Sequence, residues 1–348
     1  MSEDNAKVRI GFVGVGGMGQ AAHLRNYATM NSCEVVALAE LRPGLAQAVA
    51  ARWGVPRVYS DAASMLANEK LDGIVASQPF DKHGQIIPPL YQAGVPILTE
   101  KPLASSVQTG ERMLEALKQS GSWHMVGYHK RSDPATMYAK AEIERLKASG
   151  ELGKLKYIRI TMPSGDWVAN GFMDYIHSDE PVPALPADPG ETWDGPYVEF
   201  VNYYIHQVNL LRHLFGEPYR VSHADPSQVL LIAESDSGVP GIIEMTPFQT
   251  TLDWQESALV TFERGWVKLE LPAPLVLNQP GRVSVFADPG SGAVPQTVTP
   301  QMPWVHAMRQ QAANFVAAIR GERAPMCDAH EALEDLRVAR AYRDLIEK

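Results

Sequence analysis

The sequence predicts two domains: an α/β domain with a doubly wound parallel sheet, followed by an α+β domain with a largely antiparallel sheet. The first observation is that short apolar runs alternate with helical patterns over the first 128 residues. The second is a glycine-rich turn between the first apolar run and the first helical pattern. The third is that this alternation stops after residue 128, and several strand-like runs follow one another between residues 228 and 286. A length of 348 residues also fits two domains.

The strands of the parallel sheet are expected to be short and buried on both faces. Their residues are mostly apolar and often β-branched, without a polar face, as is typical of central strands in α/β proteins. We expect them at residues 8–13, 35–39, 58–59, 73–76, 96–99 and 124–128.

Helical patterns separate these strands. The first follows the glycines and extends to about Met30, and another covers residues 45–53. Ser60 is expected to cap the helix after the third strand. Ser105 begins a capping box for the helix before the last strand, and Gly121 is expected to end that helix.

The second domain is expected to begin with a helix that Asp133 caps and Pro134 starts. A strand over 157–162 follows. Residues 163–196 then contain six prolines and little periodicity. Because a loop of this length is usually functional or mobile, we interpret it as a candidate lid that includes Trp193.

The rest of the second domain combines one long helix with several strands. The helix is expected over 197–215, with Gly216 after its last turn. Strand-like runs follow at residues 228–234, 240–246, 256–263, 265–270 and 282–286. Two helices close the chain, the first with an apolar stripe that includes Phe315 and the second beginning at Asp328.

Composition excludes several classes of protein. Apolar residues make up 45% and charged residues 20%, which excludes a disordered or fibrous chain. The formal net charge of −9 gives no general attraction for nucleic acid or an anionic membrane. Cys33 and Cys327 match no metal spacing and predict no disulfide. With no signal-peptide pattern, no transmembrane run and no metal-ligand cluster, we expect a cytoplasmic protein without a metal.

The glycine-rich turn has the pattern G-x-G-x-x-G. It consists of Gly14, Gly16, Gly17, Met18 and Gly19, with one valine between the first two glycines. It follows a predicted strand and opens a predicted helix, which is the context that dinucleotide binding requires. The glycines permit a tight turn and a close approach of the backbone to a pyrophosphate, which the helix N-terminus attracts. The sequence therefore predicts a Rossmann dinucleotide-binding domain.

Glu40 lies 21 residues beyond Gly19, at the end of the second predicted strand. An acid at this place binds the hydroxyls of the adenosine ribose. It favours NAD, because a carboxylate repels the 2′-phosphate of NADP. Arg42 can in principle permit NADP instead, although we favour its interpretation as a solvated surface charge.

Further motifs follow the fourth and fifth strands. Ser77-Gln78-Pro79 and His83 follow the fourth, Glu100-Lys101-Pro102 follows the fifth, and His23 lies four residues beyond Gly19. The glucose–fructose oxidoreductase / inositol dehydrogenase / MocA (Gfo/Idh/MocA) family has a similar turn, His and Glu-Lys-Pro at the same places. The chain resembles this family, and the resemblance implies that Ser77, Gln78, Pro79, His83, Glu100 and Lys101 contribute to the cofactor site.

Two segments of the second domain extend the resemblance. Residues 127–134, GYHKRSDP, are similar to the family's segment at the domain junction. Residues 202–209, NYYIHQVN, lie where the family usually has Asp-x-Gly-x-His-x-x-Asp. The chain departs from the family here, because Asn202 stands in place of the usual aspartate.

The resemblance implies a Rossmann domain over 1–128 and a substrate-binding and oligomerisation domain with a large open sheet over 129–327. The last helix, 328–348, is then expected to pack back on the Rossmann domain. The implied activity is hydride transfer between the nicotinamide of NAD and a secondary hydroxyl or keto carbon of a sugar, sugar derivative or cyclitol. The implied assembly is a homodimer or homotetramer joined through that sheet.

Lys101 and His206 are the predicted catalytic residues. Lys101 follows a buried strand at the ligand-binding edge of the sheet, so its ammonium group can orient the reacting oxygen. His206 can accept the hydroxyl proton near neutral pH. The competing interpretations are a surface lysine before a proline and a hydrogen-bonded core histidine. Asn202 lies one turn before His206 and can bind a substrate hydroxyl.

Four further residues are predicted to bind the substrate. Tyr128 and Lys130 lie at the domain junction. Asp166 and Trp167 follow the first strand of the second domain, and an aromatic face beside a carboxylate suits a sugar. The alternative for Trp167 is that it anchors a loop.

Two other functions stay open. The first is an enzyme that cleaves glycosides through transient oxidation by bound NAD, which the change to Asn202 keeps open. The second is a regulatory protein that senses nucleotides without turnover; the presence of both Lys101 and His206 argues against it.

Overall fold

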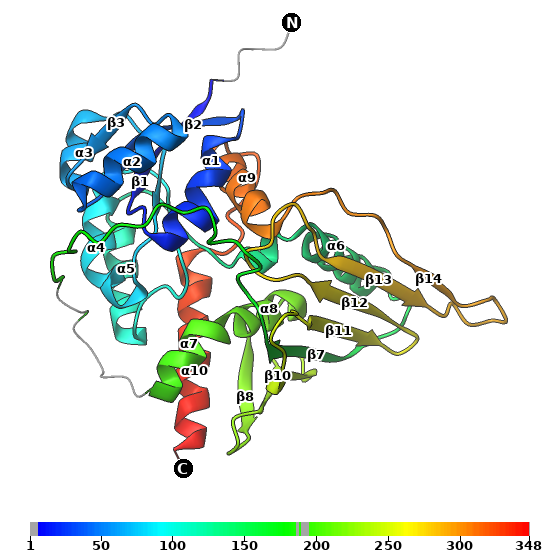
Figure 1. Cartoon of the computed structure of the whole chain (residues 1–348). Helices are drawn as coiled ribbons and strands as arrows, with labels where there is room; N and C mark the ends of the chain where they lie inside the picture. Colours follow the sequence, from blue (N-terminus) through cyan, green and yellow to red (C-terminus); the bar gives the residue numbers. More distant parts are fainter. Residues whose placement is uncertain (1–5, 186–187, 189–194, 348) are drawn as a thin grey trace, which may run out of the picture. The chain divides into compact units, whose positions relative to one another are not determined.

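The computed structural model describes residues 6–185, Asp188 and residues 195–347. These residues form two compact units, shown in Figure 1. The first unit comprises residues 6–128, 170–185, Asp188 and 311–336. The second unit comprises residues 129–169, 195–310 and 337–347. Trp193 of the expected lid lies outside the described residues.

The first unit contains a six-stranded sheet in the order β3-β2-β1-β4-β5-β6. Every neighbouring pair is parallel, which confirms the predicted doubly wound sheet. Its strands are β1 (Val8–Val13), β2 (Cys33–Ala39), β3 (Arg57–Tyr59), β4 (Gly73–Ala76), β5 (Ile97–Thr99) and β6 (His124–Val126). The order reverses beside β1, so the carboxyl ends of β1 and β4 border a topological switch point.

Helices connect these strands. They are the π-helix η1 (Gly19–Leu24), α1 (Arg25–Ala28), α2 (Pro43–Trp53), α3 (Ala62–Asn68), the 3₁₀-helix η2 (Phe80–Lys82), α4 (His83–Tyr91) and α5 (Val107–Lys118). The helical run after the glycine loop ends at Ala28 rather than near Met30, and its first six residues are π-helical.

Two predicted caps are wrong by one residue. Asp61, not Ser60, caps α3, and its carboxylate accepts a hydrogen bond from the Ser64 N–H. Ser106, not Ser105, caps α5. In each case two adjacent residues are both good caps, and the backbone places only the second of them at the turn.

The core of the first unit packs around the central strands. Ile10, Phe12 and Leu38 are fully buried in it. Phe315 belongs to the same cluster although it comes 303 residues after Phe12, and it lies edge-on against Tyr27 and Trp123. It is part of α9 (Ala307–Ile319), whose residues from 311 onward belong to this unit.

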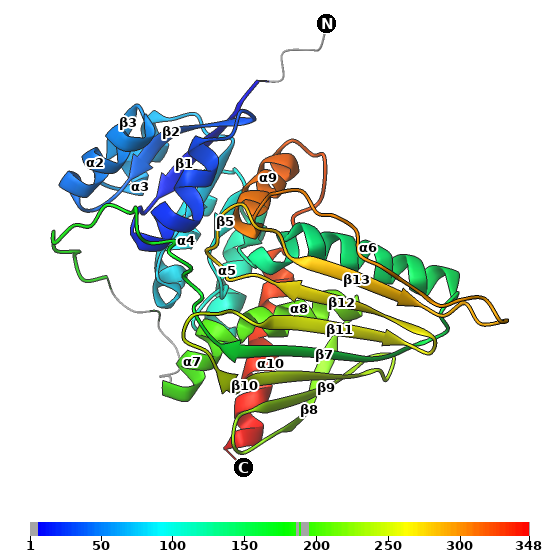
Figure 2. The ribbon, with the colours of Figure 1, turned by 45° about the vertical axis from the view of Figure 1, so that its right-hand side comes forward.

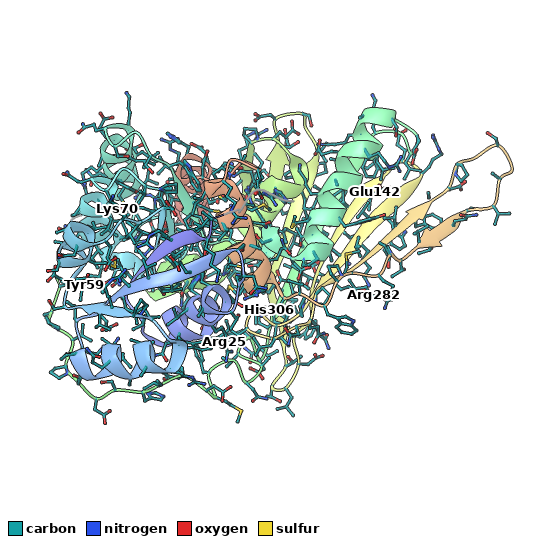
Figure 3. All side chains as sticks on the ribbon, turned by 90° about the horizontal axis from the view of Figure 1, so that it is seen from above. Arg25, Tyr59, Lys70, Glu142, Arg282 and His306 are labelled. Atoms are coloured by element: carbon teal, nitrogen blue, oxygen red, sulfur yellow. The ribbon has the colours of Figure 1, made fainter. Side chains whose placement is uncertain are left out.

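Residues 170–185 and Asp188 also belong to the first unit, unlike the sequence-based boundary that assigned all of 129–327 to the second domain. Hydrogen bonds explain this assignment. The Ile176 N–H donates to Gln20 Oε1 at 2.9 Å, and the Asp188 N–H donates to the Asp81 carbonyl at 2.9 Å. Arg25, labelled in Figure 3, lies 3.7 Å from the Asp174 carboxylate.

The second unit contains an eight-stranded sheet in the order β14-β13-β12-β11-β7-β10-β9-β8. Only the β10–β7 pair is parallel, which confirms a large, mostly antiparallel sheet. The strands are β7 (Leu155–Ser164), β8 (Tyr219–Ala224), β9 (Leu230–Ser235), β10 (Pro240–Gln249), β11 (Glu256–Phe262), β12 (Gly265–Leu271), β13 (Arg282–Ala287) and β14 (Gln296–Val298). The edge strands β8 and β14 were not expected from the sequence.

Helices cover one face of this sheet, as Figure 2 shows. Burial alternates along β11 and β12, as expected for a sheet with one covered face. The helical elements are the 3₁₀-helix η3 (His129–Ser132), α6 (Pro134–Ser149), α7 (Gly195–Tyr203) and α8 (Ile205–Phe215). The last helix of the chain, α10 (Ala329–Ile346), contributes residues to both units. No helix in the described ranges is long and apolar enough to cross a membrane.

The single helix expected over 197–215 is in fact two helices. Tyr204 lies between α7 and α8. Its hydroxyl is hydrogen-bonded to the Thr246 side chain of β10, which anchors the backbone at the junction. No proline or glycine lies at this break, so the sequence pattern predicts one continuous helix.

Candidate active site

The predicted cofactor residues of the first unit follow the carboxyl ends of four parallel strands. The glycine loop follows β1, Glu40 follows β2, Ser77 follows β4, and Glu100 follows β5. Since parallel strands end at the same edge of a sheet, these residues gather where ligands of open α/β sheets bind.

The glycine loop is tight at both ends. Gly14 has φ +84°, and a Cβ there would lie 2.2 Å from Gln78 Nε2. A Cβ at Gly19 would lie 2.7 Å from the Gly14 carbonyl oxygen. Gly16 differs, because the nearest atom to an added Cβ is Arg42 Nη2 at 3.7 Å. A side chain at Gly16 would therefore project toward the space beside the loop, where backbone must come close to a pyrophosphate.

A cavity of about 600 Å³ lies beside this loop. Within the part of the chain that the structure describes, its wall residues all belong to the first unit. They include the sequence-predicted Gly14, Gly16, Glu40, Arg42, Ser77, Gln78 and Pro79. The glycine backbone, the open position at Gly16 and an acid on the wall together fit a dinucleotide.

Glu40 and Arg42 form an ion pair on the cavity wall. Arg42 Nε donates to Glu40 Oε1 at 2.8 Å, and the Val15 N–H donates to Glu40 Oε2 at 2.9 Å. Burial raises the pKa of Glu40, but the hydrogen bonds from Arg42 and Val15 outweigh it and hold the pKa below its ordinary value of 4.5. Glu40 is therefore ionised at neutral pH and can accept hydrogen bonds from ribose hydroxyls.

His83 joins the loops that follow β4 and β5. Its Nδ1 lies 3.0 Å from the Leu103 carbonyl oxygen, and its Nε2 lies 3.2 Å from the Gln78 carbonyl oxygen. Gln78 Nε2 in turn donates to the Val13 carbonyl at 3.0 Å. Burial lowers the pKa of His83, so the ring is neutral at pH 7. These contacts hold the loops after β4 and β5 together.

Glu100 fixes the start of the Lys101 loop. His23 Nε2 lies 2.7 Å from Glu100 Oε1, and both side chains are almost fully buried. The Lys101 N–H lies 3.3 Å from Glu100 Oε2. The peptide bond from Lys101 to Pro102 is cis. Lys101 itself is partly exposed at the ligand edge of the sheet.

His206 lies at the start of α8 in the second unit, not in the middle of a long helix as expected. Its ring packs edge-on against His129, with 4.7 Å between the ring centroids. His206 is partly buried, whereas Asn202 in α7 is exposed. The helix break at Tyr204 separates the two residues that the sequence placed on one helix face.

Lys130 is buried within the second unit and paired with Glu256. Its ammonium group lies 5.5 Å from the Trp254 ring centroid. Gln207 Nε2 donates to Glu256 Oε1 at 2.7 Å, and Trp254 Nε1 donates to Glu256 Oε2 at 3.2 Å. These contacts favour a structural role for Lys130 over direct contact with a substrate.

The remaining predicted substrate residues occupy different settings. Asp166 Oδ1 accepts the N–H groups of Val168 and Ala169, both at 3.0 Å, and so organises the turn after β7. Trp167 is partly buried in that turn. Tyr128 is 2% exposed and belongs to the first unit.

Sequence reasoning missed one wall of the cavity. Val182 and Leu185, with the two residues between them, line it from the proline-rich segment. Asp61 and Lys82 were also missed. Apolar residues among the prolines were the only available signal, because an aperiodic segment gives no indication of what it packs against.

Comparison with known proteins relates the first part of the chain to a known family. Residues 8–128 match an oxidoreductase family with an NAD-binding Rossmann fold, the Gfo/Idh/MocA family. Scyllo-inositol 2-dehydrogenase (NAD(+)) of Bacillus subtilis is 26% identical over 253 residues, which cover 68% of this chain and 67% of that protein. Residues 8–128 therefore resemble the NAD-binding Rossmann domain of the Gfo/Idh/MocA oxidoreductases. The members of this family are oxidoreductases whose Rossmann domain binds NAD.

Other Gfo/Idh/MocA relatives extend the match. Levoglucosan dehydrogenase of Pseudarthrobacter phenanthrenivorans is 31% identical over 171 residues, 47% of this chain but only 42% of that enzyme. A structure of levoglucosan dehydrogenase in complex with NADH and levoglucosan aligns with a TM-score of 0.71 and 20% identity. That alignment covers 98% of both chains and supports the two-part fold over nearly the full length.

Proposed function

We propose that this protein is an NAD-dependent dehydrogenase of a sugar, sugar derivative or cyclitol, acting on a secondary hydroxyl or keto carbon. The observation that carries the proposal is the cavity beside the glycine loop, with ionised Glu40 on its wall and Lys101 at the same sheet edge. The substrate class is supported by relatives that are inositol and levoglucosan dehydrogenases.

In the proposed reaction an alcohol and NAD⁺ give a ketone, NADH and a proton, with the hydride passing to the nicotinamide. Lys101 donates a hydrogen bond to the reacting oxygen and orients it. Glu100 and His23 support this role, because their buried contact holds the backbone from which Lys101 projects.

His206 takes the hydroxyl proton in this proposal. An imidazole can accept a proton near neutral pH, and general acid–base assistance contributes roughly 10²–10⁴-fold to a rate. The edge-on packing of His129 restricts the His206 ring to a limited range of orientations. Asn202 cannot stabilise the resulting imidazolium as a carboxylate does, so we assign it to binding a substrate hydroxyl.

The test is a panel of inositols, levoglucosan, other sugars and glycosides, assayed for NADH absorbance in solution. His206→Ala and Lys101→Met are expected to lower kcat by roughly 10²–10⁴-fold with little change in NAD affinity. His330→Ala and Lys70→Met are matched controls, because His330 is exposed on α10 and Lys70 lies outside every predicted site.

The outcomes separate the candidates. Accumulation of NADH supports the dehydrogenase. Release of an aglycone without net NADH would instead support the glycoside-cleaving enzyme that Asn202 keeps open, and NAD binding without turnover on any substrate would support a nucleotide sensor. Near wild-type turnover of His206→Ala at all pH values would transfer the acid–base role to Lys101 or Tyr128.

A further inference from the structure

Helix α2 has no cap of its own. Its first helical residue is Pro43, and the residue before it, Arg42, makes no side-chain cap hydrogen bond. The first N–H groups of a helix have no partners within it. Glu180, 136 residues after Gly44, provides acceptors for two of these N–H groups. Its Oε1 accepts a hydrogen bond from the Gly44 N–H at 2.9 Å, and its Oε2 accepts one from the Leu45 N–H at 2.8 Å.

Glu180 is held in this position by its own segment. Ser178 Oγ donates to Glu180 Oε2 at 3.0 Å, and the Glu180 N–H donates to Ser178 Oγ at 3.2 Å. The N–H groups of Gly44 and Leu45 lower the pKa of Glu180 below its ordinary value. The N-terminus of α2 is therefore occupied by the ionised carboxylate of Glu180.

The same segment forms part of the cofactor cavity. Residues 176–185, which we call the strap, begin at a hydrogen bond from the Ile176 N–H to Gln20 Oε1. Two residues after Glu180 the strap reaches Val182, and from there to Leu185 it lines the cavity. The hydrogen bonds of Glu180 to α2 thus hold the strap in place just before the residues that line the cavity.

Arg42 connects Glu180 to cofactor choice. In Rossmann domains that use NADP, an arginine near this position binds the ribose 2′-phosphate. Here the Arg42 guanidinium is already paired with Glu40, with Nε–Oε1 at 2.8 Å and Nη2–Oε2 at 3.1 Å. Glu40 and, to a smaller extent, the negative charge of Glu180 raise the pKa of Arg42. The only arginine lining the described part of the cavity is thus compensated by two carboxylates.

We propose that Glu180 is a second specificity determinant that excludes NADP: together with Glu40 it surrounds Arg42 with negative charge and occupies the helix N-terminus that would otherwise attract a phosphate. Glu40 alone then accounts for only part of the preference for NAD. This inference rests on dinucleotide binding by the first unit and not on the substrate class proposed above.

The experiment is a titration of the full-length protein with NADH and NADPH by fluorescence, without substrate. Glu40→Ser alone is expected to narrow the gap between the two dissociation constants only in part. Adding Glu180→Gln is expected to tighten NADPH binding by roughly a further tenfold, because a like charge near the phosphate is removed. The NADH affinity should change less than about threefold, and the NADPH gain should shrink at high ionic strength.

Asp179→Asn in the Glu40→Ser background is the matched control. It removes one negative charge from the adjacent, exposed residue, which accepts no hydrogen bond from α2 in the described structure. Equal NADPH affinities for the Asp179→Asn and Glu180→Gln variants would overturn the proposal and leave Glu180 as a helix cap only.

Glu180→Asp separates charge from capping if Glu180→Gln weakens the fold. The shorter side chain keeps the charge but reaches the two N–H groups of α2 less well, so thermal stability is expected to fall while NADPH stays excluded. NADPH binding by Glu180→Asp as tight as by Glu180→Gln would contradict the proposal. Because no arm of this test uses a sugar, its failure is distinguishable from failure of the proposed activity.

Discussion

Two carboxylate–cation pairs, one taken from each unit, differ in their exposure to water. In the first unit Glu40 and Arg42 lie on the wall of a 600 Å³ cavity, and the Arg42 side chain is 18% exposed. In the second unit the Lys130 and Glu256 side chains are 4% and 0% exposed. Both carboxylates accept several hydrogen bonds, but only Glu40 lies against a space that a ligand can enter.

The difference teaches how to separate a ligand-binding charge from a structural one. Both oxygens of Glu256 accept hydrogen bonds from protein donors, namely the buried Gln207 and Lys130 and the partly buried Trp254. A buried pair of this kind pays a large desolvation cost and survives only when its hydrogen bonds are complete. Lys130 looked equivalent to the site residues in sequence because its partner, Glu256, is 126 residues away.

The largest effect is expected from breaking the buried pair. Glu256→Ala should lower the free energy of unfolding by about 3–5 kcal/mol, because it leaves the Lys130 charge buried without its carboxylate. Denaturant titration measures this. Glu270→Ala, which removes an exposed partner of Lys268, should cost only about 0–1 kcal/mol. An equal loss of unfolding free energy in the two variants would show that the buried pair contributes no more to stability than the exposed one.

A smaller effect on stability and a clear effect on binding are expected from Glu40→Gln. Hydrogen bonds to a charged group contribute about 1.5–3 kcal/mol, so NAD affinity should fall roughly tenfold to a hundredfold in a titration. The free energy of unfolding should change by no more than about 1 kcal/mol, since water in the cavity can solvate Arg42. A loss of stability as large as that of Glu256→Ala would mean that the cavity pair is also structural.

The smallest effect concerns pH. The folded pKa of Glu40 lies below its ordinary value of 4.5, so its ionised form contributes stability that is complete above pH 4.5 and is lost as pH falls through the folded value. NAD affinity is therefore expected to stay constant from neutral pH down to about 4.5 as far as Glu40 is concerned. Titrations of wild type and Glu40→Gln at several pH values test this. A decline near pH 6 that Glu40→Gln abolishes would show that the pKa is raised instead.

Most of the parallel sheet could be predicted from the sequence because its signals are local. Buried strands are apolar throughout, and the glycine loop joins one of them to a helix within a few residues. The predicted Asp133 cap and Pro134 start of α6 are confirmed for the same reason. The caps at Ser60 and Ser105 are wrong by one residue, since side-chain chemistry alone cannot choose between two adjacent capping residues.

Non-local contacts explain what was missed. Nothing near Tyr204 indicates that Thr246 anchors it and divides a helix. Glu180 reaches α2 from an aperiodic segment, and its role depends on two backbone N–H groups that carry no sequence signal. The roles of Lys101 and His206 remain predictions, because their chemistry depends on a substrate.

The discontinuous core of the first unit has a consequence for synthesis on the ribosome. Phe315 and Val316 pack in the same cluster as Val8 and Ile10, and the Cys327 carbonyl accepts a hydrogen bond from the Val126 N–H. The nucleotide-binding sheet, although it emerges first, stays without part of its apolar cover until about residue 336 has left the exit tunnel. An incomplete chain therefore carries exposed apolar surface for most of its translation, which is the condition under which chaperones bind nascent proteins.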